Sequence, residues 1–299
     1  MTLDGLSVPI PTLFTDTGDL DLGRNTRFAR DLSDAKVDHL FVLGSLGEFP
    51  SVADDERKRL VDLLVESVTG KTDVWVGCGA PATRSAVAYA EAAESVGAAA
   101  VVAVPPYYLR PTPAAIDRYY RAIHARISVP LFAYNIPSLV GYPLAPALVH
   151  ALARDGVVAG VKDTSGSMAS VEAFLHDAPP GFAVMPGDDA LAAEAIAHGA
   201  TGAVMGLANL VPKLCVELVA AAREKNAARA DELQRLVSEL VDVTHAGPFP
   251  SVDKFLAARL RGASVGYRAP YDPLTPEEEA AVLARLAPLE ERLKPFLGR

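Results

Sequence analysis

Lys162 closes an apolar, strand-like run and is followed at once by a polar turn. The run covers residues 157–161, and the turn reads Asp163-Thr164-Ser165-Gly166. Burial among small apolar side chains disfavours the ammonium form of a lysine, and the neutral amine can attack a carbonyl carbon. The pattern therefore indicates Schiff-base chemistry at Lys162. The alternative is a lysine at the solvated mouth of a strand that simply pairs with Asp163.

Polar residues also follow other apolar runs, at the points where strands would end. These stretches are 44–49 (Gly-Ser-Leu-Gly-Glu-Phe), 105–108 (Pro-Pro-Tyr-Tyr), 134–137 (Tyr-Asn-Ile-Pro) and 187–189 (Gly-Asp-Asp). In a barrel of parallel strands the catalytic groups sit where the strands enter the following loops. Together with Lys162, the stretches supply the parts that imine chemistry on a 2-oxo acid would use.

Two of these stretches have specific roles in such chemistry. The glycines that flank Ser45 and Leu46 let the backbone turn tightly and present successive N–H groups to a carboxylate. An ordinary strand-to-loop turn would show the same spacing. The phenol of Tyr134, on the strand before that of Lys162, can transfer protons. The alternative for Tyr134 is a half-buried aromatic ring whose hydroxyl is satisfied by a loop.

The elements that position these residues alternate between strand and helix. Short β-rich runs cover 6–14, 39–44, 73–79, 100–105, 130–136, 158–162, 183–186 and 202–206. Helical segments lie between them, for example 55–68 and 84–96, with Gly70 and Gly97 as C-terminal stops. Alternation of this kind means parallel pairing, and eight units fit a closed (β/α)₈ TIM barrel better than an open doubly wound sheet.

The pattern changes after the eighth run. Residues 214–224, 227–244, 251–260 and 276–293 all have helical patterns. We therefore predict a (β/α)₈ barrel over residues 1–224 and a C-terminal helical region over 225–299. The added helices could cap one end of the barrel, pack against a neighbouring subunit, or do both.

Composition narrows the class of protein. The chain has 299 residues, of which 50% are hydrophobic and 22% charged, and its formal net charge is -9. This charge opposes binding to nucleic acid. Cys78 and Cys215 lie far apart in apolar stretches, as reduced core thiols of a cytoplasmic protein do. The chain shows no signal sequence and no membrane-length apolar run.

Other chemical signatures are not found. The six histidines fall singly, with no spacing that would bind a metal. Ser165-Gly166-Ser167 lacks the Gly-x-Ser-x-Gly elbow of a serine hydrolase. No nucleotide-binding loop follows the first strand. We therefore expect no metal and no cofactor.

The motifs at 44–49, 106–108, 134–137, 160–166 and 187–189 occur in the order and spacing of the dihydrodipicolinate synthase / N-acetylneuraminate lyase family. The sequence resembles this family over nearly its whole length, and the match continues to Lys254 and to residues 268–274. The motifs are specific for the family and much less specific for its individual members.

The resemblance implies a catalytic set of Lys162, Tyr134, Ser45 and Tyr108. Lys162 would form the imine with pyruvate, Tyr134 would be the proton-transferring phenol, and Ser45 would be a hydroxyl of the proton relay. Backbone groups of Ser45 and Leu46 would hold the pyruvate carboxylate. Tyr108 matches a relay tyrosine that crosses from the neighbouring subunit in tetrameric members, which implies a homotetramer built as a pair of tight dimers.

The resemblance also points to the substrate pocket, and two departures from the family pattern bear on it. Gly187 and Val204 match positions that line the pocket through their backbones. Leu46 replaces a second hydroxyl, usually threonine. Leu139 replaces an arginine that binds the carboxylate of aspartate semialdehyde in dihydrodipicolinate synthases. This replacement forfeits a charge-assisted contact worth about 1.5–3 kcal/mol.

Without that arginine, the sequence is more similar to the aldolases and dehydratases of 2-keto-3-deoxy sugar acids. Asp189, Thr164 and Ser165 could hydrogen-bond the hydroxyls of such a substrate, although helix capping and turn formation explain Asp189 and Ser165 equally well.

We therefore predict a class I Schiff-base lyase, an aldolase that acts on pyruvate or another 2-oxo acid and cleaves or forms a 2-keto-3-deoxy sugar acid. The alternatives are a dihydrodipicolinate synthase, a sugar-acid dehydratase, and a non-catalytic regulator that binds a small oxo acid. The expected partners are a small 2-oxo acid, an aldehyde and further copies of the chain, with no nucleic acid and no membrane.

Overall fold

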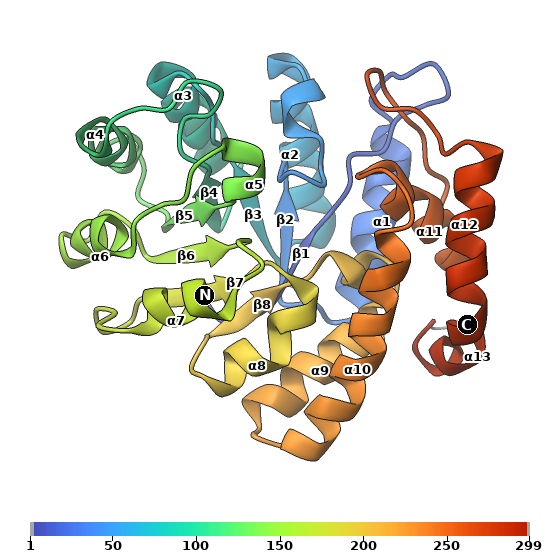
Figure 1. Ribbon diagram of the computed structural model, residues 1–299. Helices are drawn as coiled ribbons and strands as arrows, with labels where there is room; N and C mark the ends of the chain where they lie inside the picture. Colours follow the sequence, from blue (N-terminus) through green and yellow to red (C-terminus); the bar gives the residue numbers. More distant parts are fainter. Residues whose placement is uncertain (1–2, 298–299) are drawn as a thin grey trace.

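Eight parallel strands form the centre of the molecule, and helices surround them (Figure 1). The computed structural model describes residues 3–297. The strands are β1 (Gly5–Pro9), β2 (His39–Val42), β3 (Asp73–Gly77), β4 (Ala100–Ala103), β5 (Leu131–Asn135), β6 (Gly160–Asp163), β7 (Ala183–Pro186) and β8 (Gly202–Val204). Their order is β7-β6-β5-β4-β3-β2-β1-β8, and a hydrogen bond of 3.0 Å from the Thr201 N–H to the Val184 carbonyl brings β8 against β7. The prediction of a (β/α)₈ barrel is confirmed.

The helices follow the strands in alternation. They are α1 (Leu22–Asp34), α2 (Asp54–Val68), α3 (Thr83–Ser95), α4 (Pro113–His124), α5 (Pro137–Val140), α6 (Pro146–Arg154), α7 (Met168–Leu175), α8 (Ala192–Ala197) and α9 (Pro212–Arg223). Local sequence explains where several begin. The Asp21 carboxylate accepts from the Arg24 N–H at the start of α1, and Thr112 caps α4 directly before Pro113.

Aromatic side chains fill the barrel in layers. Trp75 stacks against His39 at 4.4 Å between ring centres and against Phe132 at 4.6 Å. One layer closer to the carboxyl ends of the strands, Phe41 meets Tyr134 edge to face at 6.3 Å. Because these rings occupy the interior, the barrel is a packed core and the space for a ligand lies at its mouth.

The strand predictions differ from the structure mainly at their ends. β7 has the predicted bounds, whereas the first strand was predicted to reach residue 14 and ends at Pro9. Pro9 and Pro11 lack the N–H that a ladder needs, and Phe14 instead forms an isolated antiparallel bridge with Leu20. The apolar character of this segment therefore reflects burial beyond the strand.

Four helices follow the barrel: α10 (Ala227–Thr244), α11 (Ser251–Arg261), α12 (Pro276–Leu286) and α13 (Glu290–Leu293). In Figure 1, α11 and α12 lie on the side of the barrel where α1 lies, and α10 lies beside α9. Arg261 pairs with Asp31 of α1 at 3.8 Å, and Arg24 donates to the Val265 carbonyl at 3.5 Å. The domain division after residue 224 stays a prediction. Among the helices of residues 3–297, none combines the length and apolar character that a membrane crossing requires.

Candidate active site

Lys162 and Tyr134 are direct neighbours on adjacent strands. They are register partners in the β5–β6 pair, so both side chains point to the same face of the sheet, into the barrel. The Lys162 Nζ lies 4.1 Å from the centre of the Tyr134 ring and 4.9 Å from that of Phe41. Lys162 is 6% exposed and Tyr134 is 3% exposed. The amine is therefore inside the mouth of the barrel and against a phenol.

Asp163 points away from this amine. Its carboxylate accepts from Asn135 Nδ2 at 2.7 Å and from the Ser165 hydroxyl at 3.0 Å, and no ion pair joins it to Lys162 in residues 3–297. Asn135 in turn accepts from the Leu144 N–H at 2.9 Å. The alternative of a Lys162–Asp163 pair is therefore wrong. The Ser165 hydroxyl forms a hydrogen bond within the turn, as the turn-forming alternative for this residue predicted.

The loop after β2 brings Ser45 to Tyr134. The two hydroxyl groups are 3.5 Å apart. The backbone N–H groups of Ser45 and Leu46 donate no hydrogen bond to any group within the described part of the chain, and both residues line the same cavity as Lys162. Two unsatisfied N–H groups beside a buried amine form a suitable site for a small carboxylate.

The reason for the glycines in this loop differs from the prediction. The left-handed backbone angles fall on Leu43 (φ 58°) and Glu48 (φ 51°), not on Gly44 or Gly47. Gly44 is needed because the backbone at this position passes close to the Phe41 side chain: a Cβ at position 44 would lie 2.8 Å from the Phe41 ring. The tight turn is therefore made by non-glycine residues, which other contacts must hold in place.

A cavity of about 570 Å³ opens at the carboxyl ends of the strands. The predicted site residues that line it are Ser45, Leu46, Lys162, Thr164, Gly187, Asp189 and Val204. Tyr134 lies directly beneath, against Lys162. Tyr108 is the exception, because it lies outside this cavity and is 93% exposed, with a left-handed φ of 73°.

Gly187 and Thr164 shape the cavity beside the amine. A Cβ at position 187 would collide with Thr164 Oγ1 and would lie 2.7 Å from Lys162 Cε. The Thr164 Oγ1 is buried and has no partner at ordinary hydrogen-bond geometry among the described residues, although it lies near enough to the Tyr134 hydroxyl to help lower the pKa of Tyr134. A hydroxyl at this place is available to a bound hydroxyl or carbonyl group.

Asp189 bridges the ends of β7 and β8. Its carboxylate accepts from the Gly206 N–H at 3.0 Å and from the Leu207 N–H at 2.9 Å. Burial raises the pKa of Asp189 to about 6, although these two hydrogen bonds oppose the rise. Both oxygens are thus engaged with the backbone, which supports a structural role for Asp189 beside any contact with substrate.

The environment of Tyr134 favours loss of its proton. Burial alone would raise the pKa of Tyr134, but the nearby Lys162 charge and the Ser45 hydroxyl bring the pKa below its ordinary value. A phenol with a lowered pKa is a better general base near neutral pH.

The sequence analysis missed the residues that the C-terminal helices contribute to the cavity. These are Val241, Thr244, His245, Gly247, Phe249, Val252 and Asp253. The segment between α10 and α11 therefore covers the mouth of the barrel, one of the options that the sequence left open. Burial raises the pKa of Asp253 to about 7, and repulsion from Asp189 adds to the rise. The Gly-Pro-Phe-Pro sequence at 247–250 indicated a connection between two helices, but it did not indicate that this connection lies at the mouth of the barrel.

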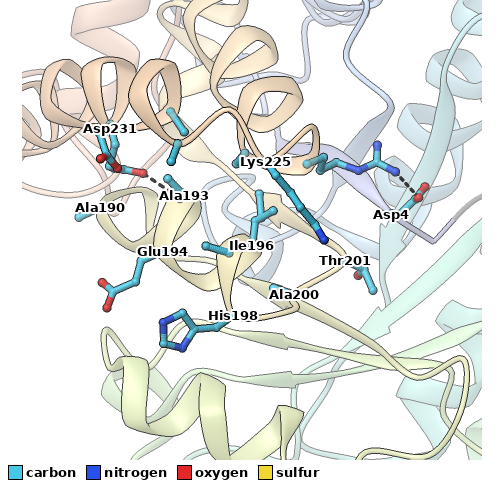
Figure 2. Close-up of a pocket in the computed structure, with 16 residues that line it drawn as sticks. Asp4, Ala190, Ala193, Glu194, Ile196, His198, Ala200, Thr201, Lys225 and Asp231 are labelled. Carbon is cyan, nitrogen blue, oxygen red and sulfur yellow. Dashed lines mark hydrogen bonds and ion pairs between the residues drawn. The ribbon is translucent and has the colours of Figure 1, made fainter.

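A larger cavity, of about 930 Å³, lies outside the barrel, against α8, α9 and α10 (Figure 2). Asp4 forms an ion pair with Arg223 at its edge, and the Ala193 N–H donates to Gln234 at 2.9 Å. Lys162 does not line it, and neither does any other predicted site residue. Size alone therefore does not identify the active site.

The fold and the buried lysine–tyrosine pair define a (β/α)₈-barrel protein with an amine and a phenol side by side at the carboxyl ends of its strands. Residues 2–288 match the model of the dihydrodipicolinate synthetase family. The chain belongs to this family and is a lyase of the family.

The relatives include lyases with different named reactions. The chain is 37% identical, over 96% of its length and 94% of the relative, to an uncharacterized DapA-like lyase of Halobacterium salinarum. It is 35% identical to a 4-hydroxy-tetrahydrodipicolinate synthase of Thiobacillus denitrificans, over 95% of this chain and 96% of the relative.

A third relative, YagE of Escherichia coli, is named a putative 2-dehydro-3-deoxy-D-gluconate aldolase. It is 33% identical over 76% of each chain. Its crystal structure in complex with pyruvate superimposes with a TM-score of 0.92, covering 97% of this chain and 99% of YagE at 30% identity.

Proposed function

We propose that the protein is a class I pyruvate-dependent aldolase in which Lys162 forms an imine with the 2-oxo acid. The observation that carries the proposal is the position of the Lys162 amine, which is 6% exposed, lines the cavity and lies 4.1 Å from the Tyr134 ring centre. A desolvated amine beside a proton-transferring phenol is what attack on a carbonyl requires. The pyruvate complex of the similar protein YagE supports the choice of 2-oxo acid.

The first step joins the two reactants. The Lys162 ammonium first gives a proton to the ionised Tyr134. The neutral amine then attacks the keto carbon of the substrate, the resulting carbinolamine gains a proton and loses water, and a protonated imine remains. The Ser45 and Leu46 N–H groups would hold the substrate carboxylate during this step. Tyr134, 3.5 Å from the Ser45 hydroxyl, would carry the protons that enter and leave.

Carbon–carbon cleavage then uses the imine as an electron sink. Tyr134 takes the proton from the C4 hydroxyl of a 2-keto-3-deoxy sugar acid, the C3–C4 bond breaks, and its electron pair moves into the imine to give an enamine. The aldehyde leaves. The enamine is protonated at C3, and water releases pyruvate and restores the Lys162 amine.

The charge of the cavity favours an uncharged aldehyde as the second reactant. Asp188, Asp189 and Asp253 line the cavity, and Lys162 is the one lysine or arginine among its described lining residues. A second carboxylate on the substrate would therefore meet acidic groups without a cationic partner. Hydroxyl groups of the substrate could form hydrogen bonds with Thr164 and with the carboxyl group of Asp253, in either of its protonation states.

Three alternatives share parts of this arrangement. A dihydrodipicolinate synthase would need a contact for the carboxylate of aspartate semialdehyde, and Leu139 lines the cavity where the resemblance expects an arginine. A sugar-acid dehydratase would form the same imine and release water in place of an aldehyde, so product analysis separates the two. A regulator would bind the oxo acid without turnover.

Borohydride reduction in the presence of pyruvate tests the imine. We expect peptide mass mapping to find the reduced pyruvate adduct on Lys162. Lys254 is an internal control, because it is fully buried but does not line the cavity. An adduct on other lysines only, or unchanged turnover in Lys162→Ala, would contradict the proposal. Incubation with 2-keto-3-deoxy sugar acids and detection of pyruvate then identifies the substrate.

Tyr108 supports a proposal about assembly. Its exposed ring and left-handed backbone present an aromatic side chain that does not reach the cavity of its own chain. In a homotetramer built as a pair of dimers, Tyr108 of one subunit would complete the proton relay of the next. Analytical ultracentrifugation tests the assembly. A cytoplasmic location also stays a prediction, which the free and buried thiols of Cys78 and Cys215 support.

A further inference from the structure

The two N–H groups that face the cavity from the loop after β2 belong to peptide units whose carbonyls are tied down. The Glu48 N–H donates to the Ser45 carbonyl at 3.0 Å, and the Phe49 N–H donates to the Gly44 carbonyl at 3.4 Å. In a planar trans peptide the C=O and N–H point in opposite directions. The Ser45 carbonyl shares its peptide with the Leu46 N–H, and the Gly44 carbonyl shares its peptide with the Ser45 N–H. The backbone of residues 48–49 therefore sets the direction of both N–H donors.

Glu48 holds this backbone in an unfavourable conformation. Its φ of 51° lies in the left-handed region, which is costly for a residue with a Cβ. Its main chain also accepts from the Ser51 N–H at 2.8 Å, and the neighbouring Gly47 carbonyl accepts from the Thr12 hydroxyl at 2.6 Å. A strained residue of this kind persists only when its surroundings hold it.

The holding contact comes from the C-terminal helices. The Glu48 carboxylate, 1% exposed, forms an ion pair with Lys254 of α11, whose side chain is 0% exposed. Lys254 Nζ also donates to the Gly266 carbonyl at 3.0 Å and lies 4.8 Å from the centre of the Phe14 ring. Burial raises the pKa of Glu48, and Lys254 opposes that rise. The Gly266 carbonyl and the Phe14 ring thus hold the ammonium in place in addition to Glu48.

We infer that Glu48 and Lys254 are positioning residues for substrate recognition: the buried pair fixes the turn that aims the Ser45 and Leu46 N–H groups at the substrate carboxylate. The inference rests on the proposed function, because it gives those N–H groups the role of carboxylate ligands. It assigns to the C-terminal helices a part in recognising the 2-oxo acid, although neither side chain lines the cavity.

A second ion pair supplies a matched control. Arg268 binds Glu56 through two hydrogen bonds of 2.6 Å and donates to the Ser51 carbonyl at 3.0 Å. It therefore ties the same C-terminal region to α2 and to Ser51, which follows the turn, but it makes no hydrogen bond to residues 44–48. The double variant E56Q/R268Q removes this tie while the Glu56→Gln amide oxygen can still accept from the Ala53 N–H.

The experiment compares two carbonyl probes in borohydride trapping on Lys162: pyruvate, which has a carboxylate, and acetone, which lacks one. The double variant E48Q/K254M removes both charges of the buried pair, so no lone ion is left inside the protein. We expect its labelling efficiency for pyruvate relative to acetone to fall about tenfold or more, which corresponds to about 1.4 kcal/mol of carboxylate recognition. E56Q/R268Q should keep the ratio of the wild-type protein.

The outcomes are distinct. An unchanged pyruvate-to-acetone ratio in E48Q/K254M overturns the inference, because carboxylate recognition is then intact without the buried pair. An equal fall of the ratio in E56Q/R268Q also overturns it, because the effect would then come from general loosening of the barrel. Absence of pyruvate labelling on Lys162 of the wild-type protein overturns the proposed function, and the inference with it. Should thermal unfolding show that E48Q/K254M is not folded, the single variant Glu48→Gln is compared instead. It replaces the ion pair by a weaker contact with a neutral acceptor, so we expect a smaller fall in the same ratio, and an unchanged ratio overturns the inference.

Discussion

Tyr134 and Lys162 are register partners across β5 and β6, and the amine of one lies 4.1 Å from the ring centre of the other. The parallel ladder fixes this relationship, since partners in register project to the same face of a sheet. No loop movement is needed to bring the two groups together. Their approach is therefore a property of the barrel itself, and loop residues can vary without disturbing it.

Tyr134→Phe should separate imine formation from cleavage. The variant lacks the hydroxyl that takes the C4 proton, so we expect turnover of a 2-keto-3-deoxy sugar acid to fall about 10²–10⁴-fold. Borohydride trapping of pyruvate on Lys162 should be slower but still detectable, because the amine remains. Equal rates of cleavage in the variant and the wild-type protein would exclude Tyr134 as the base.

Gly187→Ala should displace the reactive amine at little cost in stability. The added Cβ would collide with Thr164 Oγ1 and come within 2.7 Å of Lys162 Cε, and both are movable ends of side chains. A misplacement of about 1 Å can lower a rate about 10²-fold, and we expect a loss of that order in pyruvate trapping. Gly206→Ala is the control, because its nearest contact is Asp189 at 3.7 Å. A similar loss in both variants would argue against a specific effect on Lys162.

Asp253→Asn should change how stability depends on pH. The pKa of Asp253 is raised to about 7, whereas the carboxyl of an unfolded chain has a pKa of about 3.9. Between these values the folded state keeps a proton that the unfolded state releases, so the contribution of Asp253 to stability falls as the pH rises. We expect the variant to exceed the wild-type free energy of unfolding by about 1 kcal/mol or more at pH 8, and by less as the pH approaches 4.

Urea unfolding of Asp253→Asn at several pH values measures this difference. Asp242→Asn is a suitable control, because Asp242 is exposed on the neighbouring helix α10. A difference between Asp253→Asn and the wild-type protein that is constant from pH 5 to pH 8 would contradict the raised pKa.

Leu139→Arg should widen the range of second substrates. Leu139 lines the cavity and is 60% exposed, so a longer side chain fits without disturbing the core. A guanidinium there could bind a second carboxylate, and a charge-assisted hydrogen bond is worth about 1.5–3 kcal/mol. We expect kcat/KM for condensation of pyruvate with aspartate semialdehyde to rise about tenfold or more. Leu139→Gln, of similar length but without charge, should show no such gain.

Lys254→Met should be strongly destabilising by itself. It leaves the Glu48 carboxylate buried without its cation, and breaking a buried ion pair in this way typically costs about 3–5 kcal/mol. Adding Glu48→Gln removes the remaining charge and should restore most of the stability. Urea unfolding of the single and double variants measures both values. A double variant that is less stable than Lys254→Met would contradict the expectation that the unpaired Glu48 charge causes the loss of stability.

The sequence predicted the barrel because its signals are local. β-rich runs occur eight times, and each run lies at or overlaps a strand. The bounds of α10 and β7 are as predicted, since clear breaks flank both. The first strand was predicted too long, because residues 10–14 are largely apolar as a result of burial, while Pro9 and Pro11 lack the N–H that ladder pairing needs.

The candidate site was predictable only where residue type and strand position coincide. Lys162 and Tyr134 lie near the carboxyl ends of β6 and β5, and Ser45 lies in the loop after β2, so their convergence follows from the topology. Asp253 and Phe249 lie more than eighty residues beyond Lys162 in the chain and reach the cavity through the packing of α10 and α11, for which periodicity gives no direction. The left-handed angles at Leu43 and Glu48 were also hidden, because neither residue type signals such a conformation.

The link between Glu48 and Lys254 has a consequence for how this barrel can be cut or recombined. A chain truncated after residue 224 would keep Lys162, Tyr134 and Ser45, yet Glu48 and Glu56 would lose their cationic partners. Chimeras between relatives would face the same constraint wherever a crossover separates the acidic residue from its lysine. The eight strands carry the proposed reacting groups, and we expect the C-terminal helices to be inherited together with the turn that they hold.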